Sequence, residues 1–211
     1  MKINRLAVRL CMCALVLFRA LSLYADGKDS LSRKMIHIAG IDVKPAYVFP
    51  THEFFSGNNA TFSPIRKNLS VHLKYGFKFA PDTYFGRMYP HGVQGIGVGY
   101  NTFFHSSELG TPWSVYAFQT SRIASLTPRL SLDYEWNFGA SFGWKKYDAE
   151  SNPYNRVVGS KMNAYIHLSF LLNWQLDAQT NLRAGIGATH FSNGNTAYPN
   201  AGVNTLGASI G

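Results

Sequence analysis

A histidine, a serine and an asparagine near the carboxyl end of the chain are residue types that hydrolytic enzymes use together. His190 and Ser192 are two residues apart, and Asn204 follows after a polar link. A serine hydroxyl becomes a nucleophile when a neutral imidazole accepts its proton and a third group holds the other ring nitrogen. The predicted chemistry is acyl transfer, with Ser192 as nucleophile, His190 as general base and Asn204 as the group that orients the imidazole.

The link between Ser192 and Asn204 has the sequence NGNTAYPNAGV, which is rich in glycine and asparagine. Backbone and side-chain N–H groups in such a link can stabilise the oxyanion of a tetrahedral intermediate. Asn193, Gly194 and Asn200 are the candidates for this role. Acyl transfer of this kind needs no metal ion and no organic cofactor, so we expect none.

Alternating apolar residues on both sides of the link predict a β-hairpin. Every second residue from Leu182 to Ala188 is apolar, and the same parity continues to His190 and Ser192. Every second residue from Leu206 to Ile210 is also apolar, and Asn204 stands two positions before this run. The three polar side chains therefore project from the apolar side of the hairpin, where a soluble protein would have its core.

Three other segments, residues 69–79, 130–144 and 162–176, alternate over longer stretches than soluble strands usually do. In each, one side is apolar with large aromatic residues and almost no charge, and the other side is mostly polar or glycine. A lipocalin-like soluble barrel would turn the apolar side inward. The aromatic residues and the lack of charge on that side instead favour an all-β fold, an eight-stranded antiparallel transmembrane β-barrel whose apolar side faces lipid.

We predict eight strands, with long links toward the cell surface and short turns toward the periplasm. The predicted strands are residues 36–49, 67–79, 93–104, 112–124, 129–145, 161–176, 180–192 and 204–211. Short links are expected at residues 125–128 and 177–180, whereas residues 80–92 form a link too long for this rule. Inside, we expect Arg183, Lys74 and Lys78 to pair with Asp133 and Glu135, which argues against a pore.

The amino terminus predicts an exported protein. Lys2, Arg5 and Arg9 precede an apolar stretch, and small Ala25 precedes Asp26, which is the order of a secretory signal peptide. We expect residues 1–25 to be removed and residues 26–211 to form the barrel. Outer-membrane strands often continue to an aromatic residue, whereas this sequence ends at Gly211. A truncated carboxyl end is therefore one interpretation.

Removal of the signal peptide changes both the charge and the cysteine content. The full chain has 211 residues and a formal charge of +9, but four of its twenty Lys and Arg and none of its eleven acids precede Asp26, which leaves +5. Both cysteines lie in the same segment, so the exported chain has no thiol for a disulfide or metal site. The basic excess suits an anionic surface and does not indicate nucleic-acid binding.

The run HFSNGNTAYPNAGVN, from His190 to Asn204, resembles the active-site hairpin of the outer-membrane lipid A 3-O-deacylases of the PagL type. The resemblance implies an eight-stranded barrel whose catalytic residues face lipid, with His190 as base and Ser192 as nucleophile. It also implies that Asn193, Gly194, Pro199 and Asn200 belong to the loop and oxyanion region. Asn204 departs from the family, which carries a glutamate at this position.

The implied reaction is hydrolysis of an ester-linked 3-hydroxyacyl chain of lipid A in the bacterial outer membrane, with the active site toward the outer leaflet. Lipopolysaccharide and outer-membrane lipids are the expected partners, and the oligomeric state stays open. Basic loop residues could meet the phosphates of lipid A; these are Lys145, Lys146, Arg156 and Lys161.

Several alternatives remain. A non-catalytic barrel of the OmpA or OmpX kind would serve as a structural or adhesive surface protein. A palmitoyl transferase barrel would bind its acyl chain inside, which the polar lumen disfavours. His105, Ser107 and Glu108 form a second His-x-Ser with a nearby acid, but a polar surface loop is the better interpretation.

Overall fold

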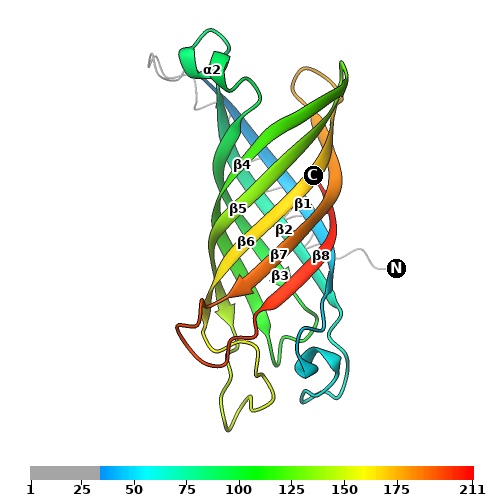
Figure 1. Ribbon diagram of the computed structural model, residues 1–211, viewed down its shortest axis with the longest axis vertical. Helices are drawn as coiled ribbons and strands as arrows, with labels where there is room; N and C mark the ends of the chain where they lie inside the picture. The colour runs from blue at the N-terminus through cyan, green and yellow to red at the C-terminus, as the bar shows by residue number, and fades with distance from the viewer. Residues whose placement is uncertain (1–33) are drawn as a thin grey trace, which may run out of the picture.

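Residues 34–211 are described by a computed structural model, and they form a closed barrel of eight antiparallel strands (Figure 1). The strands are β1 Met35–Val48, β2 Lys67–Phe79, β3 Val93–Thr102, β4 Gly110–Thr127, β5 Leu130–Trp144, β6 Met162–Gln175, β7 Asn181–Ser192 and β8 Val203–Ile210. Each strand pairs with its sequence neighbours, and β1 pairs with β8 to close the ring. The predicted fold class is confirmed, whereas the predicted signal peptide lies outside the described residues.

The barrel has two unlike ends (Figure 1). The links 49–66, 103–109, 145–161 and 193–202 lie at one end, called the loop end below. The first of these links contains the short 3-10 helix η2 (Glu53–Ser56). The other end, called the α2 end, holds the short helix α2 (Tyr84–Met88) in the link 80–92 and two shorter links, 128–129 and 176–180.

One predicted turn is shorter in the structure. Residues 125–127 were expected in a link, but β4 continues to Thr127 and only Pro128 and Arg129 connect it to β5. Register shifts between Arg122 and Ala124, and between Ser125 and Thr127, allow this extension, because bulges absorb the broken alternation without ending the pairing. Within residues 34–211, no helix is long and apolar enough to cross a bilayer.

Large apolar side chains cover the outer surface of the strands at the predicted parity. Among them are Leu73, Ile96, Phe138 and Ile186, whose side chains are 58–65% exposed. Trp144 is an exception, because it was predicted on this surface but is 2% exposed inside the barrel. The adjacent Gly143 has a φ of +89°, and this left-handed residue interrupts the alternation and turns the tryptophan inward.

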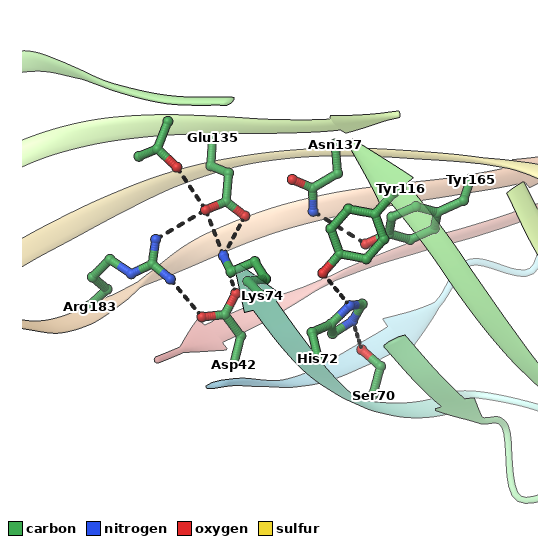
Figure 2. Close-up of polar contacts among 10 residues, drawn as sticks. Asp42, Ser70, His72, Lys74, Tyr116, Glu135, Asn137, Tyr165 and Arg183 are labelled. Carbon is green, nitrogen blue, oxygen red and sulfur yellow. Dashed lines mark hydrogen bonds and ion pairs between the residues drawn. The ribbon is translucent and has the colours of Figure 1, made fainter. Parts of the chain in front are cut away.

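The middle of the lumen is filled by a cluster of two acids and two bases (Figure 2). The Lys74 Nζ lies 2.5 Å from the Asp42 carboxylate and 2.7 Å from that of Glu135. Arg183 bridges the same two acids at 2.8 Å and 3.1 Å. Thr120 donates a further hydrogen bond of 2.9 Å to Glu135. The two acids and two bases pair with one another, which offsets the cost of burying their charges, whereas the Nζ of the nearby buried Lys44 has no partner among the described residues.

Of the ion pairs predicted inside the barrel, those of Glu135 are confirmed and the others differ. Lys74 and Arg183 both pair with Glu135 as expected, whereas their second partner, Asp42, was not predicted. Lys78 forms no ion pair among the described residues, so its predicted pairing is wrong. Asp133 is approached at 3.9 Å by Arg122, because the β4 bulges bring that arginine to the end of the lumen.

Toward the loop end, the filling changes from charged to aromatic. His72 makes 2.9 Å hydrogen bonds to Tyr116 and to Ser70 (Figure 2), and its ring stacks on Tyr165. A group of buried apolar residues then closes the loop end. Its members are Val48, Phe54, Phe55, Ile65, Phe103, Leu109, Tyr116, Trp144, Val157, Val158, Tyr165, Phe191 and Val203, and Phe118 continues the group toward the α2 end.

At the α2 end the lumen opens into a cavity of about 290 Å³, lined in part by Lys78, His91, Arg122 and Asp133. Partial burial and the neighbouring Arg122 guanidinium lower the pKa of His91 below its usual value. Along the barrel, the interior therefore changes from buried aromatic side chains at the loop end, through the ion cluster, to a cavity at the α2 end that is lined by more basic than acidic side chains.

The ion cluster predicts a large stability cost when one charge is removed. Glu135→Gln leaves an excess positive charge buried among Lys74 and Arg183, so the free energy of unfolding should fall by about 3 kcal/mol. Urea unfolding of the purified protein in lipid vesicles measures this change. Glu150→Gln, at an exposed loop acid, is the matched control and should change stability by less than about 0.5 kcal/mol. Equal effects of the two variants would contradict a stabilising role for the cluster.

Candidate functional site

The predicted site residues lie on β7 and β8 at the loop end. His190 and Asn204 are directly opposite each other in the antiparallel pair. His190 and Ser192 share the outward parity of the exposed Ile186, whereas Phe191 between them is 2% exposed inside the barrel. The phenyl ring of Phe191 packs against Trp144 and Tyr165 at centroid distances of 5.1 and 5.5 Å. Because this anchor points inward, its two neighbours must point outward.

One hydrogen bond joins two of the three predicted catalytic residues. The His190 Nδ1 lies 2.7 Å from the Asn204 Oδ1. Since a carbonyl oxygen only accepts, Nδ1 is the donor in this hydrogen bond, and in the neutral form of the ring the lone pair is then on Nε2. This is the tautomer that a general base toward a neighbouring hydroxyl requires.

Ser192 lies one outward position beyond His190, beside Ala164 of β6. Among the described residues, no hydrogen bond joins its hydroxyl to His190. The Cβ atoms of residues i and i+2 on a strand are about 7 Å apart. An imidazole ring spans part of this distance toward the serine hydroxyl. Hydrogen bonds of catalytic groups are often long without substrate and shorten when it binds.

Gly202 completes this outer surface and was not predicted from the sequence. A Cβ atom at this position would lie 3.2 Å from the His190 Cε1 and 3.7 Å from the Ser192 Cβ. The glycine has a φ of +72°, which disfavours any other residue. Its place at the end of the Pro-Asn-Ala-Gly sequence is the signal that could have identified it.

Side chains of the loop 193–202 make several hydrogen bonds within the loop. The Asn193 N–H donates to the Asn200 Oδ1 at 3.1 Å, and the Asn193 side-chain amide donates to the Ala197 carbonyl at 2.7 Å. The Asn200 amide donates to Asn195 at 3.1 Å. The backbone N–H groups of Gly194 and Asn200 have no protein acceptor within the described residues, and nothing lies within 4 Å of where a Cβ of Gly194 would be. Of the three oxyanion candidates, Gly194 and Asn200 therefore have a backbone donor free for a ligand.

The neighbouring link 145–161 braces this loop. The Gly202 N–H donates to the Val157 carbonyl at 3.3 Å, and Val157 is 1% exposed. The same link exposes four basic side chains, which are Lys145, Lys146, Arg156 and Lys161. Its Asp148 accepts hydrogen bonds from the Ser151 N–H and hydroxyl, and these hold its pKa below the usual range. Basic residues still outnumber the acids Asp148 and Glu150 on this surface.

The second His-x-Ser has a different arrangement. The His105 Nε2 lies 3.2 Å from Ser63 and its Nδ1 lies 3.2 Å from the Phe103 carbonyl. Glu108 accepts from the Ala60 N–H at 2.6 Å. These contacts tie the links 49–66 and 103–109 together. Ser107 is exposed and makes no hydrogen bond with His105 among the described residues.

The potential metal ligands do not cluster. No group of three or more His, Cys, Asp or Glu side chains suited to a metal ion occurs within residues 34–211. His72 and His167 are instead held by hydroxyl groups, at 2.9 Å from Tyr116 and 2.8 Å from Thr189 respectively.

Comparisons with known proteins identify the family. The family model described as "Lipid A 3-O-deacylase (PagL)" matches residues 99–211, slightly more than half of the chain. This chain belongs to the lipid A 3-O-deacylase (PagL) family. The matched part runs from Gly99 in β3 to the carboxyl end and includes His190, Ser192 and Asn204. Membership in the PagL family places the barrel in the outer membrane, and the predicted family is confirmed.

A solved structure supports the same fold. The "Crystal structure of the outer membrane enzyme PagL" superposes with a TM-score of 0.50 and 12% sequence identity, over 81% of this chain and 97% of that chain. At this identity the likeness concerns the fold alone. No curated protein matches the chain in sequence.

The hydrogen bond to Asn204 makes a prediction about the His190 ring that does not depend on activity. Asn204→Leu removes the acceptor, so the preference for the Nδ1–H tautomer should fall about fivefold, the equivalent of one neutral hydrogen bond. Nitrogen-15 NMR of histidine-labelled protein in detergent reads the tautomer, and His190→Gln assigns the signal. An unchanged tautomer in the leucine variant would show that another group holds the ring.

Proposed function

We propose that this PagL-family protein hydrolyses an ester-linked 3-hydroxyacyl chain of lipid A through a Ser-His mechanism. The carrying observation is the 2.7 Å hydrogen bond between His190 and Asn204, on the outward side of the barrel beside Ser192. It fixes an imidazole in the tautomer of a general base where acyl chains of the bilayer reach it.

The reaction proceeds in two halves. The Ser192 hydroxyl attacks the ester carbonyl of lipid A while His190 Nε2 takes its proton, and a tetrahedral oxyanion forms. The intermediate collapses as His190 returns the proton to the departing sugar hydroxyl, which leaves an acyl group on Ser192. Water, activated by the same imidazole, then releases a free 3-hydroxy fatty acid and restores the serine.

The oxyanion needs N–H donors aimed at it. The backbone N–H groups of Gly194 and Asn200 are the available donors, since the loop uses the backbone N–H of Asn193 and the side-chain amide of Asn200. The side chains of Asn193 and Asn200 then act by holding the loop that carries these donors. A ligand-induced change in the loop would add their donors to the site.

The surroundings of the site suit an amphiphilic substrate. Below His190, outward Ala188 and Leu206 continue the apolar wall along which an acyl chain can lie. Above it, the basic side chains Lys145, Lys146, Arg156 and Lys161 meet the phosphates of the sugar headgroup. Because long loops of outer-membrane barrels face the cell exterior, the loop end and the site lie at the outer leaflet.

A non-catalytic structural barrel of the OmpA or OmpX kind is the second candidate. It is favoured by one observation, which is that Ser192 and His190 share no hydrogen bond among the described residues. The neutral Asn204 also gives no negative charge to an imidazolium. The two candidates differ in whether purified protein changes lipid A.

Loss of the proposed nucleophile or base should abolish deacylation. Ser192→Ala and His190→Ala are each expected to lower the release of 3-hydroxy fatty acid from lipopolysaccharide by at least about a thousandfold. Mass spectrometry of lipid A, before and after incubation with protein in detergent, measures the release. Ser107→Ala, in the second His-x-Ser, is the matched control and should retain full activity. Release that survives in Ser192→Ala would exclude this mechanism, and no release by the unmodified protein would favour the structural barrel.

Restoring an acid at position 204 should increase the rate. In Asn204→Glu the carboxylate stabilises the imidazolium that forms during attack, and the stronger charge-assisted hydrogen bond predicts a gain of about tenfold in kcat/KM. The fatty-acid release assay compares this variant with Asn204→Gln, which keeps the amide. A gain shared by both variants would point to side-chain length instead of charge.

A further inference from the structure

The link that carries α2 is unexpectedly long for its end of the barrel. Thirteen residues, 80–92, connect β2 to β3, whereas the other two links at the α2 end have two and five residues. Figure 1 places α2 beyond the barrel wall at the end opposite the candidate site. The length therefore has no explanation in the site chemistry.

Four large side chains of this link are exposed. Tyr84, Phe85, Met88 and Tyr89 are 63%, 52%, 52% and 57% exposed. A helix of five residues that presents so much apolar surface to water would be unfavourable. Aromatic residues with a polar tip are typical of the boundary between acyl chains and headgroups.

The backbone fixes the direction in which these side chains point. Thr83 caps the helix through a 3.0 Å hydrogen bond from the Gly86 N–H, and Gly86 is buried against Ala80 so closely that any Cβ would clash with the Ala80 carbonyl. The Arg87 guanidinium donates to the Asp82 carbonyl at 2.7 Å. Gly86 thus packs against its own link, and the large side chains on either side of it stay exposed.

The exposed surface is continuous with the lipid-facing wall. Phe85 packs on Phe79 at a centroid distance of 5.3 Å, and Phe79 packs on Phe77 at 5.8 Å. Both phenylalanines of β2 share the outward parity of Leu73, which is 58% exposed. A row of aromatic rings thus runs from the barrel wall to α2.

We propose that α2 is an interfacial anchor that seats Phe85 and Met88 in the phospholipid leaflet at its end of the barrel. Tyr84 and Tyr89 lie at headgroup level, and exposed Arg87 has guanidinium donors left for a lipid phosphate. The leaflet is the periplasmic one if the candidate site faces the outer leaflet. The anchor is independent of the proposed esterase activity, which concerns the other end.

Site-directed spin labelling tests the anchor directly. Both cysteines precede Asp26, so a chain expressed from Asp26 and refolded contains a single thiol after substitution. A nitroxide on Met88→Cys, in phosphatidylethanolamine and phosphatidylglycerol vesicles, should collide frequently with oxygen and rarely with a water-soluble nickel chelate. Gln179→Cys, exposed on a neighbouring link of the same end, is the aqueous control, and Leu73→Cys is the lipid-facing control.

The expected result is a Met88 label at a depth between the two controls, with at least about a threefold lower nickel accessibility than the Gln179 label. A Met88 label as accessible to nickel as the Gln179 label would overturn the anchor. A label shielded from both reagents would show that a second copy of the chain covers α2, and would overturn it equally. Fatty-acid release in detergent should be unchanged in Met88→Cys, so failure of the anchor and failure of the esterase are separately visible.

Discussion

A side chain on a strand of a closed barrel can point only into the lumen or out of it, and the chemistry of this protein depends on that constraint. Phe191 occupies an inward position within the aromatic group at the loop end. His190 and Ser192 are its neighbours along β7, so both are directed outward. A shift of one residue in the register would place the aromatic ring in lipid and the two polar groups in the lumen.

In the middle of the lumen, ion pairs between two acids and two bases hold the strands together. Lys74 and Arg183 each contact both Asp42 and Glu135, and these four residues come from β1, β2, β5 and β7. The cluster therefore ties together strands that do not all pair directly. Such a satisfied polar network makes the interior rigid, and the proposed site lies on the outside.

The two ends of the barrel carry different kinds of side chain. At the loop end, braced links surround a histidine whose ring is held by an amide, and basic side chains lie above it. At the α2 end, a short helix places aromatic side chains beside the lipid-facing wall, and the lumen opens into a basic cavity. One end thus carries the proposed site, and the other presents aromatic groups suited to a bilayer boundary.

The sequence by itself determined the strands, their outward faces and the location of His190, Ser192 and Asn204 on one side of one hairpin. These features follow from a two-residue period, which is local and therefore readable. Only the tertiary structure decided the features that depend on contacts between residues distant in sequence. Asp42 joined the ion cluster because strands distant in sequence meet in the lumen, and Trp144 turned inward because Gly143 adopts a left-handed conformation. Gly202 lies beside His190, and Phe85 packs on Phe79, because loops fold back onto the barrel. Loop contacts of this kind leave no periodic pattern in the sequence.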